Sequence, residues 1–439
     1  MKWKKSLLGW FVVGLVLCDV FQNADSFSHR PPSRRDWLWS NGCGAATIAA
    51  NSLLAPSRGN AAPIITGNLP KLANQYYDTP IATKPEAGQF YFPTLTPPFQ
   101  NRATYRYTLG RNSWALEQLL TFANVTATIR CNVIQLQNGA GGLWVHSPQW
   151  PTGEFCSLLD ELGTVEHIVL PCNAFEHKAP VKAFVIRYPN AKVWVSPGQY
   201  GPLGRCGTTL TDPNTLGYKI DGVLGDPTNP PPPWADEFDI ATLYVDLPKN
   251  AGPVSEVAFC HRPTKTLVST DAVVYVPPMA PRILSTYFDQ VTIQDRDFWP
   301  KSVLQAVFLP IRTDTRGNYP GYEALVDRLV RAPILRAVVD ARAPEAVRDW
   351  IDKQTNGSWN FDRVLTSHFA SPIEATPADV RASFQYLFED DIQKLLGTSS
   401  RLPPIECQDW ELLDSINQFI AKTNTGEKAI FDFQRGCIE

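Results

Sequence analysis

The sequence predicts an α/β protein with two β-sheets, and three observations support this class. Two apolar, β-rich runs flank a glycine-rich turn at 138–142, which predicts an antiparallel hairpin. Short strand-like and helix-like segments then alternate along residues 154–195, as in an α/β layer. Further β-rich runs lie between residues 241 and 366, and they require a second sheet.

The first half of the core is predicted as a hairpin followed by alternating helices and strands. The expected elements are strands at 128–136 and 143–146, a helix at 154–162, a strand at 165–170, a helix at 181–188 and a strand at 192–195. The helices are short and separate apolar strands, which is typical of strand-helix-strand units.

The second half is predicted to supply the other sheet and the C-terminal helices. The expected elements are strands at 241–246, 256–260 and 266–276, a helical stretch at 322–353, a strand at 361–366 and helices at 377–396 and 410–422. The strands at 256–260 and 266–276 form a hairpin around residues 262–265, and the helical stretch is broken near Pro333 and Pro344, because proline interrupts helices.

The N-terminus is predicted to contain targeting segments. Residues 1–26 have the pattern of a signal peptide: Lys2, Lys4 and Lys5 precede an apolar run at 7–17, and small residues follow at Ala24 and Ser26. The apolar run is too short to span a bilayer, which takes roughly 20 residues. We therefore expect cleavage and not anchoring.

Residues 27–62 are predicted as a plastid transit segment that ends in a twin-arginine thylakoid signal. Residues 27–35 are rich in Ser and Arg, and they follow the signal peptide as in the bipartite leaders of complex algal plastids, which they resemble. Arg34 and Arg35 precede a mildly apolar stretch that ends in small residues before Pro63. We expect the thylakoid lumen, and retention in the stroma is the alternative.

Composition limits the class of protein. The chain has 439 residues, 44% hydrophobic and 19% charged, which is typical of a globular protein. The formal charge of −3 leaves no basic surface for nucleic acid. Residues 1–62 hold seven basic and three acidic residues, so the mature chain is more acidic still. No segment of the mature chain is apolar enough over a sufficient length to cross a membrane, so none is predicted to do so.

Residues 63–127 are predicted as an extended arm, because 63–98 is rich in proline and dotted with aromatic residues. Seven cysteines follow residue 62, none in a Cys-x-x-Cys pair, which argues against a zinc ribbon. Sequence alone leaves their disulfide pairing open.

Three runs carry a resemblance to a known family. They are Gly-Leu-Trp-Val-His-Ser-Pro at 142–148, Val-Glu-His-Ile-Val-Leu-Pro at 165–171 with Asn173 and His177 behind it, and Tyr-Pro-Asn-Ala-Lys-Val-Trp-Val-Ser-Pro at 188–197. Over residues 131–371 the chain resembles the plant, algal and cyanobacterial domain of unknown function 4336. That family is similar to the metallo-β-lactamase fold, so the resemblance implies a four-layer αββα sandwich at 128–371, with a C-terminal helical extension at 372–439.

The resemblance also implies that one of two superfamily metal sites is lost. Active members carry a His-x-His-x-Asp-His loop. Here the loop has Cys172 and Ala174 where the leading histidines belong, followed by Glu176 and His177. A further histidine expected near residue 250 is also missing. The first metal site is therefore expected to be dismantled.

The second site keeps four possible ligands. Glu176, His177, Asp271 and His368 occupy the corresponding positions and could hold one zinc, iron or manganese ion. His146, Cys172 and Asn173 are expected to support them. The alternatives remain open: Asp271 as a turn cap, His368 as a polar residue at a strand end, and Glu176 with His177 as an ordinary polar loop pair.

Two functions are consistent with these features. The leading interpretation is a plastid protein that acts as a binding or assembly component, with a protein partner at the thylakoid and no cofactor. The alternative is a hydrolase that uses a single metal ion at Glu176, His177, Asp271 and His368. No Ser-His-Asp motif, phosphate-binding glycine loop or dinucleotide fingerprint is evident.

Overall fold

The computed structural model describes residues 71–72, 76–77, 102–122, 125–137, 142–199, 217–246, 253–423 and 429–439. They belong to one compact unit, Ile65–Glu439. The expected signal peptide at 1–26 and the transit segment at 27–62 lie outside the described residues, as do Cys206 and much of the expected arm.

The larger sheet has eight strands in the order β2-β3-β4-β5-β6-β7-β8-β9. Their bounds are Tyr76–Tyr77, Tyr105–Gly110, Ser113–Phe122, Val125–Gln135, Leu143–His146, Val165–Leu170, Lys192–Val195 and Gly222–Val223. Strands β2 to β6 pair antiparallel, and β6 to β9 pair parallel. The parallel half follows from helices α2 (Gly153–Asp160) and α4 (Val181–Arg187), which provide the crossover connections.

The second sheet has six strands in the order β1-β16-β15-β12-β11-β10. Their bounds in that order are Lys71–Leu72, Ile373–Glu374, Arg363–Leu365, Thr266–Val268, Pro253–His261 and Phe238–Asp246. Strands β13 (Val273–Tyr275) and β14 (Leu329–Arg331) form a separate antiparallel pair. Within the six-stranded sheet, β12 and β15 run parallel, so the residues that follow them leave the sheet at the same edge.

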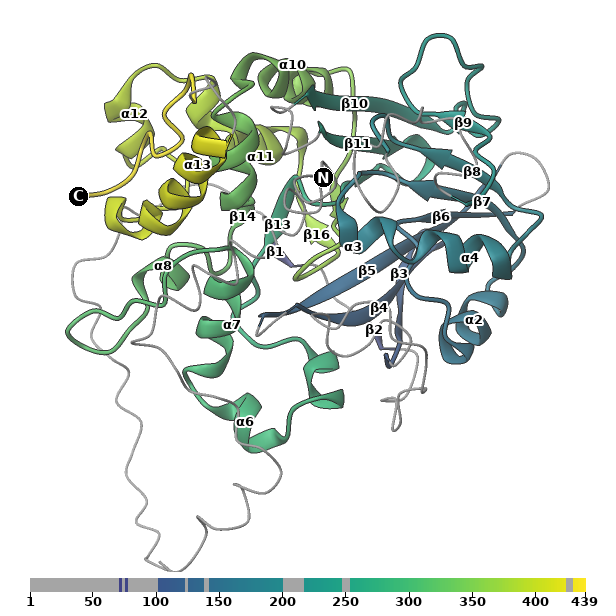
Figure 1. Ribbon diagram of the computed structural model, residues 1–439, viewed down its shortest axis with the longest axis horizontal. Helices are drawn as coiled ribbons and strands as arrows, with labels where there is room; N and C mark the ends of the chain where they lie inside the picture. Colours follow the sequence, from purple (N-terminus) through teal and green to yellow (C-terminus); the bar gives the residue numbers. More distant parts are fainter. Residues whose placement is uncertain are drawn as a thin grey trace, which may run out of the picture. The chain divides into compact units, whose positions relative to one another are not determined.

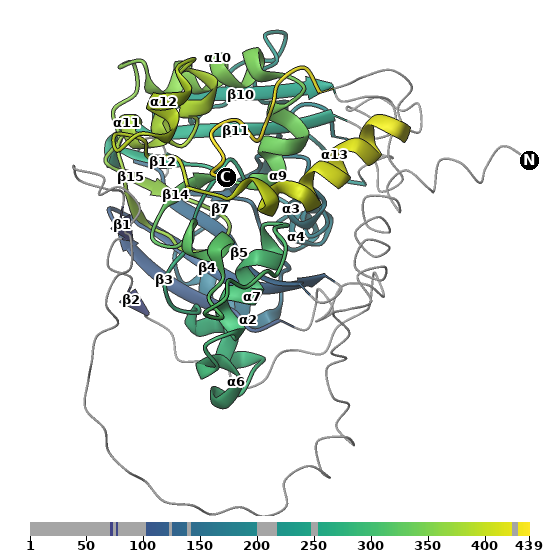
Figure 2. The same ribbon diagram turned by 90° about the vertical axis from the view of Figure 1, so that its left-hand side faces the viewer.

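The two sheets face each other, and helices cover their outer faces (Figures 1 and 2). Phe155 of α2 and Phe184 of α4 pack with Val145 and other apolar residues of the eight-stranded sheet. On the other side, α10 (Pro344–Thr355) places Trp350 against β10, where its indole Nε1 donates to Ala241 O at 2.9 Å. The order of the layers is helix, sheet, sheet, helix.

Aromatic side chains fill much of the space between the sheets. The ring of Trp144 on β6 stacks on Phe238 with centroids 4.7 Å apart and meets Phe259 edge to face at 5.1 Å. All three side chains are buried. Large aromatic rings bury about 150–250 Å² each, so this cluster is a main contribution to the association of the two sheets. The predicted α/β class and αββα sandwich are confirmed.

The prediction of an arm over residues 63–127 was wrong for its second half. Strands β3 and β4 lie within it, and β5 begins at Val125. Burial alternates along β3, and Gly110, Arg111 and Asn112 at the β3–β4 turn all have positive φ, between 53° and 72°. A left-handed turn with glycine at its start closes this hairpin. The proline-rich run at 63–98 led to the prediction of an arm, although apolar and polar residues alternate along β3.

The C-terminal region is also more integrated than predicted. Ile373 lies on β16 inside the six-stranded sheet, and Val380 and Phe384 belong to the core beneath that sheet. Residues 373–402 therefore contribute to the sandwich and are not a separate extension. A disulfide, Cys407–Cys437, closes the C-terminal segment.

Two further predicted elements differ from the structure. The expected strand at 266–276 is two strands, β12 and β13, separated by a turn at residues 269–272. The expected helical stretch at 322–353 contains strand β14, which pairs with β13. Non-local strand pairing outweighs helical propensity here. Among the described residues, no helix combines the length and apolarity needed to cross a membrane.

The remaining C-terminal helix predictions fare unevenly. The expected helix at 377–396 is α11 (Pro377–Ala382), a short 3-10 turn and α12 (Ile392–Leu396). The expected helix at 410–422 is confirmed as α13 (Glu411–Thr423). Helices α6 (Gln290–Gln294) and α7 (Phe298–Ala306) had no counterpart in the prediction.

Candidate metal centre

Four possible metal ligands from separate parts of the chain meet at one edge of the sandwich. Glu176 and His177 lie on the short helix α3 (Phe175–Lys178), which follows β7. Asp271 lies in the turn after β12, and His368 follows β15. One ligand atom from each of the four lies within 4.8 Å of those of the other three. The parallel pairing of β12 with β15 explains why the last two meet.

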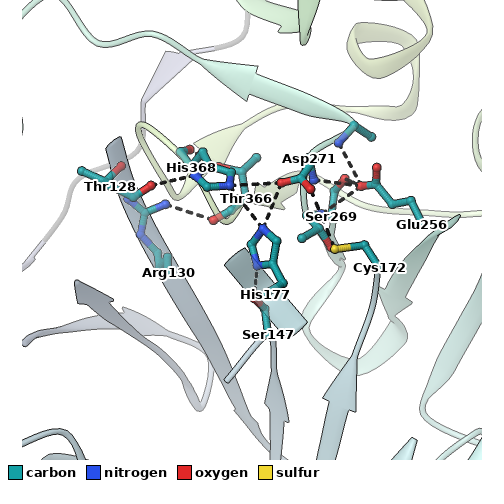
Figure 3. Close-up of polar contacts among 12 residues, drawn as sticks. Thr128, Arg130, Ser147, Cys172, His177, Glu256, Ser269, Asp271, Thr366 and His368 are labelled. Carbon is teal, nitrogen blue, oxygen red and sulfur yellow. Dashed lines mark hydrogen bonds and ion pairs between the residues drawn. The ribbon is translucent and has the colours of Figure 1, made fainter. Parts of the chain in front are cut away.

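Three of the four ligand atoms form a nearly equilateral triangle. His177 Nε2 lies 3.1 Å from Asp271 Oδ1 and 3.2 Å from His368 Nε2, and His368 Nε2 lies 3.2 Å from Asp271 Oδ1. Figure 3 shows the three side chains pointing toward one another. His177 is fully buried, and the side chains of Asp271 and His368 are 19% and 15% exposed. The triangle is therefore reachable from one side.

Hydrogen bonds on the far sides of the rings set the histidine orientations. His368 Nδ1 lies 2.7 Å from Thr128 O, and a carbonyl only accepts, so this nitrogen carries the proton. His177 Nδ1 lies 2.5 Å from Ser147 Oγ. When both rings are protonated at Nδ1, both Nε2 atoms present lone pairs to the Asp271 carboxylate. Such a convergence requires a cation, either a metal ion or an added proton.

Electrostatics in the cluster favour a positive partner for Asp271. Burial alone would raise the pKa of Asp271, but His177 and His368 hold it well below its usual range. Burial alone would lower the pKa of His368, but the hydrogen bond and charge of Asp271 raise it above its usual value. Without a metal ion, the cluster is thus a carboxylate paired with a histidine that readily takes up a proton.

The triangle fits a transition-metal ion. Tetrahedral ligands at about 2.0–2.1 Å from zinc are separated by roughly 3.3–3.4 Å. The measured edges of 3.1–3.2 Å come close to this value. Two imidazoles with one carboxylate suit zinc, iron or manganese better than calcium or magnesium, which prefer oxygen ligands.

The fourth residue, Glu176, is held less firmly. None of the described residues forms a hydrogen bond or ion pair with its side chain, and it is half-buried. It therefore stands beside the triangle with a carboxylate free to bind a metal ion or to accept a proton.

The three residues expected to support the ligands play different parts. The Cys172 thiol donates to Asp271 Oδ2 at 3.8 Å, and burial raises its pKa well above its usual value, with Asp271 adding to the shift. Asn173 binds the start of β11, through Pro253 O at 2.6 Å and the Ser255 N–H at 3.1 Å. Cys172 therefore contacts the cluster directly, whereas Asn173 fixes the neighbouring strand.

His146 does not contact the ligands. It is fully buried, stacks on Trp144 and meets Phe259 edge to face, and neither ring nitrogen has a hydrogen-bond partner among the described residues. Burial, with a smaller contribution from the nearby His177, lowers its pKa to about 3. This histidine is a neutral member of the aromatic core.

A series of contacts that sequence analysis missed runs through Ser147, His177 and Asp271. The same three residue types form the nucleophilic triad of serine hydrolases. Here Ser147 is fully buried, which closes its hydroxyl to substrate. Its backbone is left-handed, with φ 54°, directly after β6. The contact with Ser147 therefore orients His177. In the sequence, only the position of Ser147 in the Trp-Val-His-Ser-Pro run could have suggested this role.

Arg130 on β5 holds the loop that carries His368. Its guanidinium donates to Thr366 O at 3.0 Å and to Phe369 O at 2.5 Å, and it forms an ion pair with Glu117 at 2.5 Å. Arg130 and Glu117 are both nearly inaccessible to solvent. A buried charge pair thus fixes the backbone on either side of His368.

One known family matches most of this chain. The model of the domain of unknown function DUF4336 matches residues 111–305 and 314–386, which is more than half of the chain. The chain belongs to this family. None of the curated proteins matches it in sequence.

Solved structures with similar folds include three proteins of low sequence identity. A putative diflavin flavoprotein fragment from Nostoc sp. PCC 7120 shows 10% identity and a TM-score of 0.37, covering 65% of this chain and 94% of that one. A metallo-β-lactamase from Pontibacter korlensis shows 12% identity and a TM-score of 0.32, covering 65% and 100%. The metal-soaked Flv1 flavodiiron core from Synechocystis sp. PCC6803 shows 8% identity and a TM-score of 0.36, covering 65% and 61%. At these values the case for the site depends on its own geometry.

Proposed function

We propose that this protein binds one transition-metal ion at His177, Asp271 and His368 and is a metal-dependent hydrolase. The supporting observation is the convergence of a carboxylate oxygen and two imidazole nitrogens at 3.1–3.2 Å. The lost first metal site and the proline-rich arm favour a binding component without a cofactor. The geometry favours the metal-dependent hydrolase, because a turn cap and an unrelated strand-end histidine would not be expected to place their ligand atoms 3.2 Å apart.

Each residue has a distinct part in this proposal. His177, Asp271 and His368 hold the ion, which supplies Lewis acidity and lowers the pKa of a water molecule. Catalytic zinc sites commonly use three protein ligands and leave a position open. Glu176, with its carboxylate beside the triangle and no hydrogen bond from a described residue, accepts the proton.

Activity and metal content together test this assignment. The full chain, loaded with Zn²⁺, Fe²⁺ or Mn²⁺, is assayed with activated carboxylate esters and phosphodiesters. His177→Ala should remove both metal and activity, whereas Glu176→Gln should retain metal and lose activity. Loss of metal in Glu176→Gln would make Glu176 a ligand instead, and the absence of metal-dependent hydrolysis would overturn the enzymatic assignment.

A second candidate function, binding of a protein partner at the thylakoid, is favoured by one surface feature. Met279 and Val291 are 77% and 82% exposed, and Tyr287 between them in sequence is 41% exposed. These residues lie within 13 positions of one another in the sequence, and exposed large apolar residues favour protein contacts where they form a patch. Recovery of a defined complex from thylakoid membranes should be lost in Val291→Asp and retained in Ile186→Asp, which changes an exposed residue of α4. Equal recovery of both variants would argue against this surface.

The plastid location is part of the same proposal and rests on the N-terminal segments. Mass spectrometry of the mature N-terminus tests it. A start at Pro63 supports export into the thylakoid lumen, a start between residues 27 and 62 supports the stroma, and an uncleaved Met1 contradicts both.

A further inference from the structure

The turn that carries Asp271 is wrapped around a buried acid. Glu256 on β11 is 4% exposed, and its Oε1 accepts the backbone N–H groups of Thr270, Asp271 and Ala272 at 3.1, 3.0 and 2.9 Å. The Ser269 hydroxyl donates to the same oxygen at 3.1 Å. Four donors on one oxygen fix the backbone of this turn from residue 269 to residue 272 (Figure 3).

A buried base holds the other side of the turn. Arg331 on β14 lies opposite Val273 in the β13–β14 pair, and its Nη1 donates to Ala272 O at 3.1 Å. Two further nitrogens contact Asp340, with Nε to Oδ2 at 3.0 Å and Nη2 to Oδ1 at 2.7 Å. The side chains of Arg331 and Asp340 are 2% and 0% exposed. The two contacts with Asp340 fix the orientation of the Arg331 guanidinium.

Capping the turn does not account for this arrangement. An Asn or Ser side chain within a turn typically accepts only one or two backbone N–H groups, whereas Glu256 reaches over from the neighbouring strand and accepts four donors with one oxygen. Like charges that share a buried site repel each other, so a carboxylate at this position has an electrostatic cost. Fixing the backbone of residues 270–272 also fixes the direction of the Asp271 side chain. A precise direction for this carboxylate is a reason to keep Glu256 despite its electrostatic cost.

We propose that Glu256 and Arg331 are positioning residues that hold the Asp271 carboxylate toward His177 and His368. This inference rests on the proposed metal site, because the direction of Asp271 matters for binding only when it is a ligand. Residues that orient metal ligands commonly contribute about 10–100-fold to metal affinity. Neither side chain is expected to touch the ion.

The test measures Zn²⁺ affinity of the full chain by competition with a chromophoric chelator. Glu256→Ala should raise the dissociation constant about 10–100-fold, whereas Glu256→Gln, which keeps an acceptor oxygen, should recover most of the loss. The absorption spectrum of Co²⁺-loaded protein reports ligand geometry and should change in Glu256→Ala. A merely structural role would leave this spectrum unchanged.

Glu237→Ala is the matched control. Glu237 is also a buried acid, and it accepts the Gln137 N–H at 2.9 Å and contacts His261 Nε2 at 3.0 Å. It lies next to Phe238, which pairs with the opposite end of β11 from Glu256. Its loss should lower stability and leave Zn²⁺ affinity and the Co²⁺ spectrum unchanged.

A second variant covers the case in which Glu256→Ala does not fold. Arg331→Lys keeps the positive charge and leaves Glu256 in place, but it loses the paired contacts with Asp340. It should therefore weaken Zn²⁺ binding several-fold. Wild-type affinity and spectrum in the folded variants would overturn the positioning roles and leave the metal site standing. A wild-type chain that does not bind Zn²⁺ would overturn the metal site and this inference together.

Discussion

Acidification should weaken metal binding through His368. In the metal-free protein, Asp271 raises the pKa of His368, so that below this pKa a proton must leave before a metal ion binds. Each displaced proton contributes about 1.4 kcal/mol per pH unit, which is a tenfold change in apparent affinity. The pKa of Asp271 is held so low that this residue adds no competing proton above about pH 4. One tenfold loss per pH unit is therefore expected from His368.

Asp271 and His368 should stabilise the metal-free fold more at mildly acidic pH, which is the opposite of the pH effect on metal binding. The pKa of His368 is raised above its unfolded value, so its contribution is fully present below about pH 6.5 and is lost as the pH rises through the folded pKa. The pKa of Asp271 is lowered, so its contribution is present above about pH 3.9 and is lost only toward much lower pH. The pair stabilises the metal-free fold most between about pH 4 and 6.5.

Two measurements between about pH 5 and 8 check this reasoning. Zn²⁺ affinity is measured by chelator competition, and unfolding is followed with excess chelator. His368→Gln should weaken binding and remove this proton's share of the pH dependence. His167→Gln serves as the control, because burial already lowers the pKa of His167 to about 4 and keeps it neutral. A pH-independent affinity in the wild type, or unchanged pH dependence in His368→Gln, would refute the reasoning.

Three further changes should have measurable effects on stability. Replacing Cys407 and Cys437 by Ser removes a cross-link between residues 30 apart and should cost roughly 3–4 kcal/mol in urea unfolding, whereas an unchanged midpoint would contradict this expectation. Arg130→Met leaves Glu117 without its ion-pair partner and should cost about 3–5 kcal/mol, whereas a loss of under about 1 kcal/mol would count against this expectation. The double variant with Glu117→Leu should recover only part of the loss, because Thr366 O and Phe369 O still lack their donor. His146→Phe removes two ring nitrogens that have no hydrogen-bond partner among the described residues and should be neutral or stabilising, so a marked fall in Tm would contradict this expectation.

Strands with a local signal could be predicted from the sequence. The runs at 165–170 and 192–195 match β7 and β8, because continuous apolar residues bounded by turns suit buried parallel strands. Burial alternates along β3, and β4 is almost continuously buried from residue 113 to residue 120, but the proline-rich run before them drew the prediction toward an extended arm. Strand β14 had no local signal, since its pairing with β13 is non-local.

The candidate site shows a similar division. Glu176, His177, Asp271 and His368 were found through the family resemblance, and the structure brings their ligand atoms together. Ser147, Glu256 and Arg331 were missed, because each acts through a contact with a residue 15 to 59 positions away in the chain. Pairing between distant backbone groups creates such contacts, and no spacing in the sequence encodes them.

The metal content of the purified full chain tests the central claim most directly. Elemental analysis should find about one equivalent of zinc, iron or manganese in the wild type. His177→Ala, Asp271→Asn and His368→Ala should each lose it, while Glu237→Ala should retain it. A wild-type chain without metal after loading, or variants that bind metal as the wild type does, would contradict the claim.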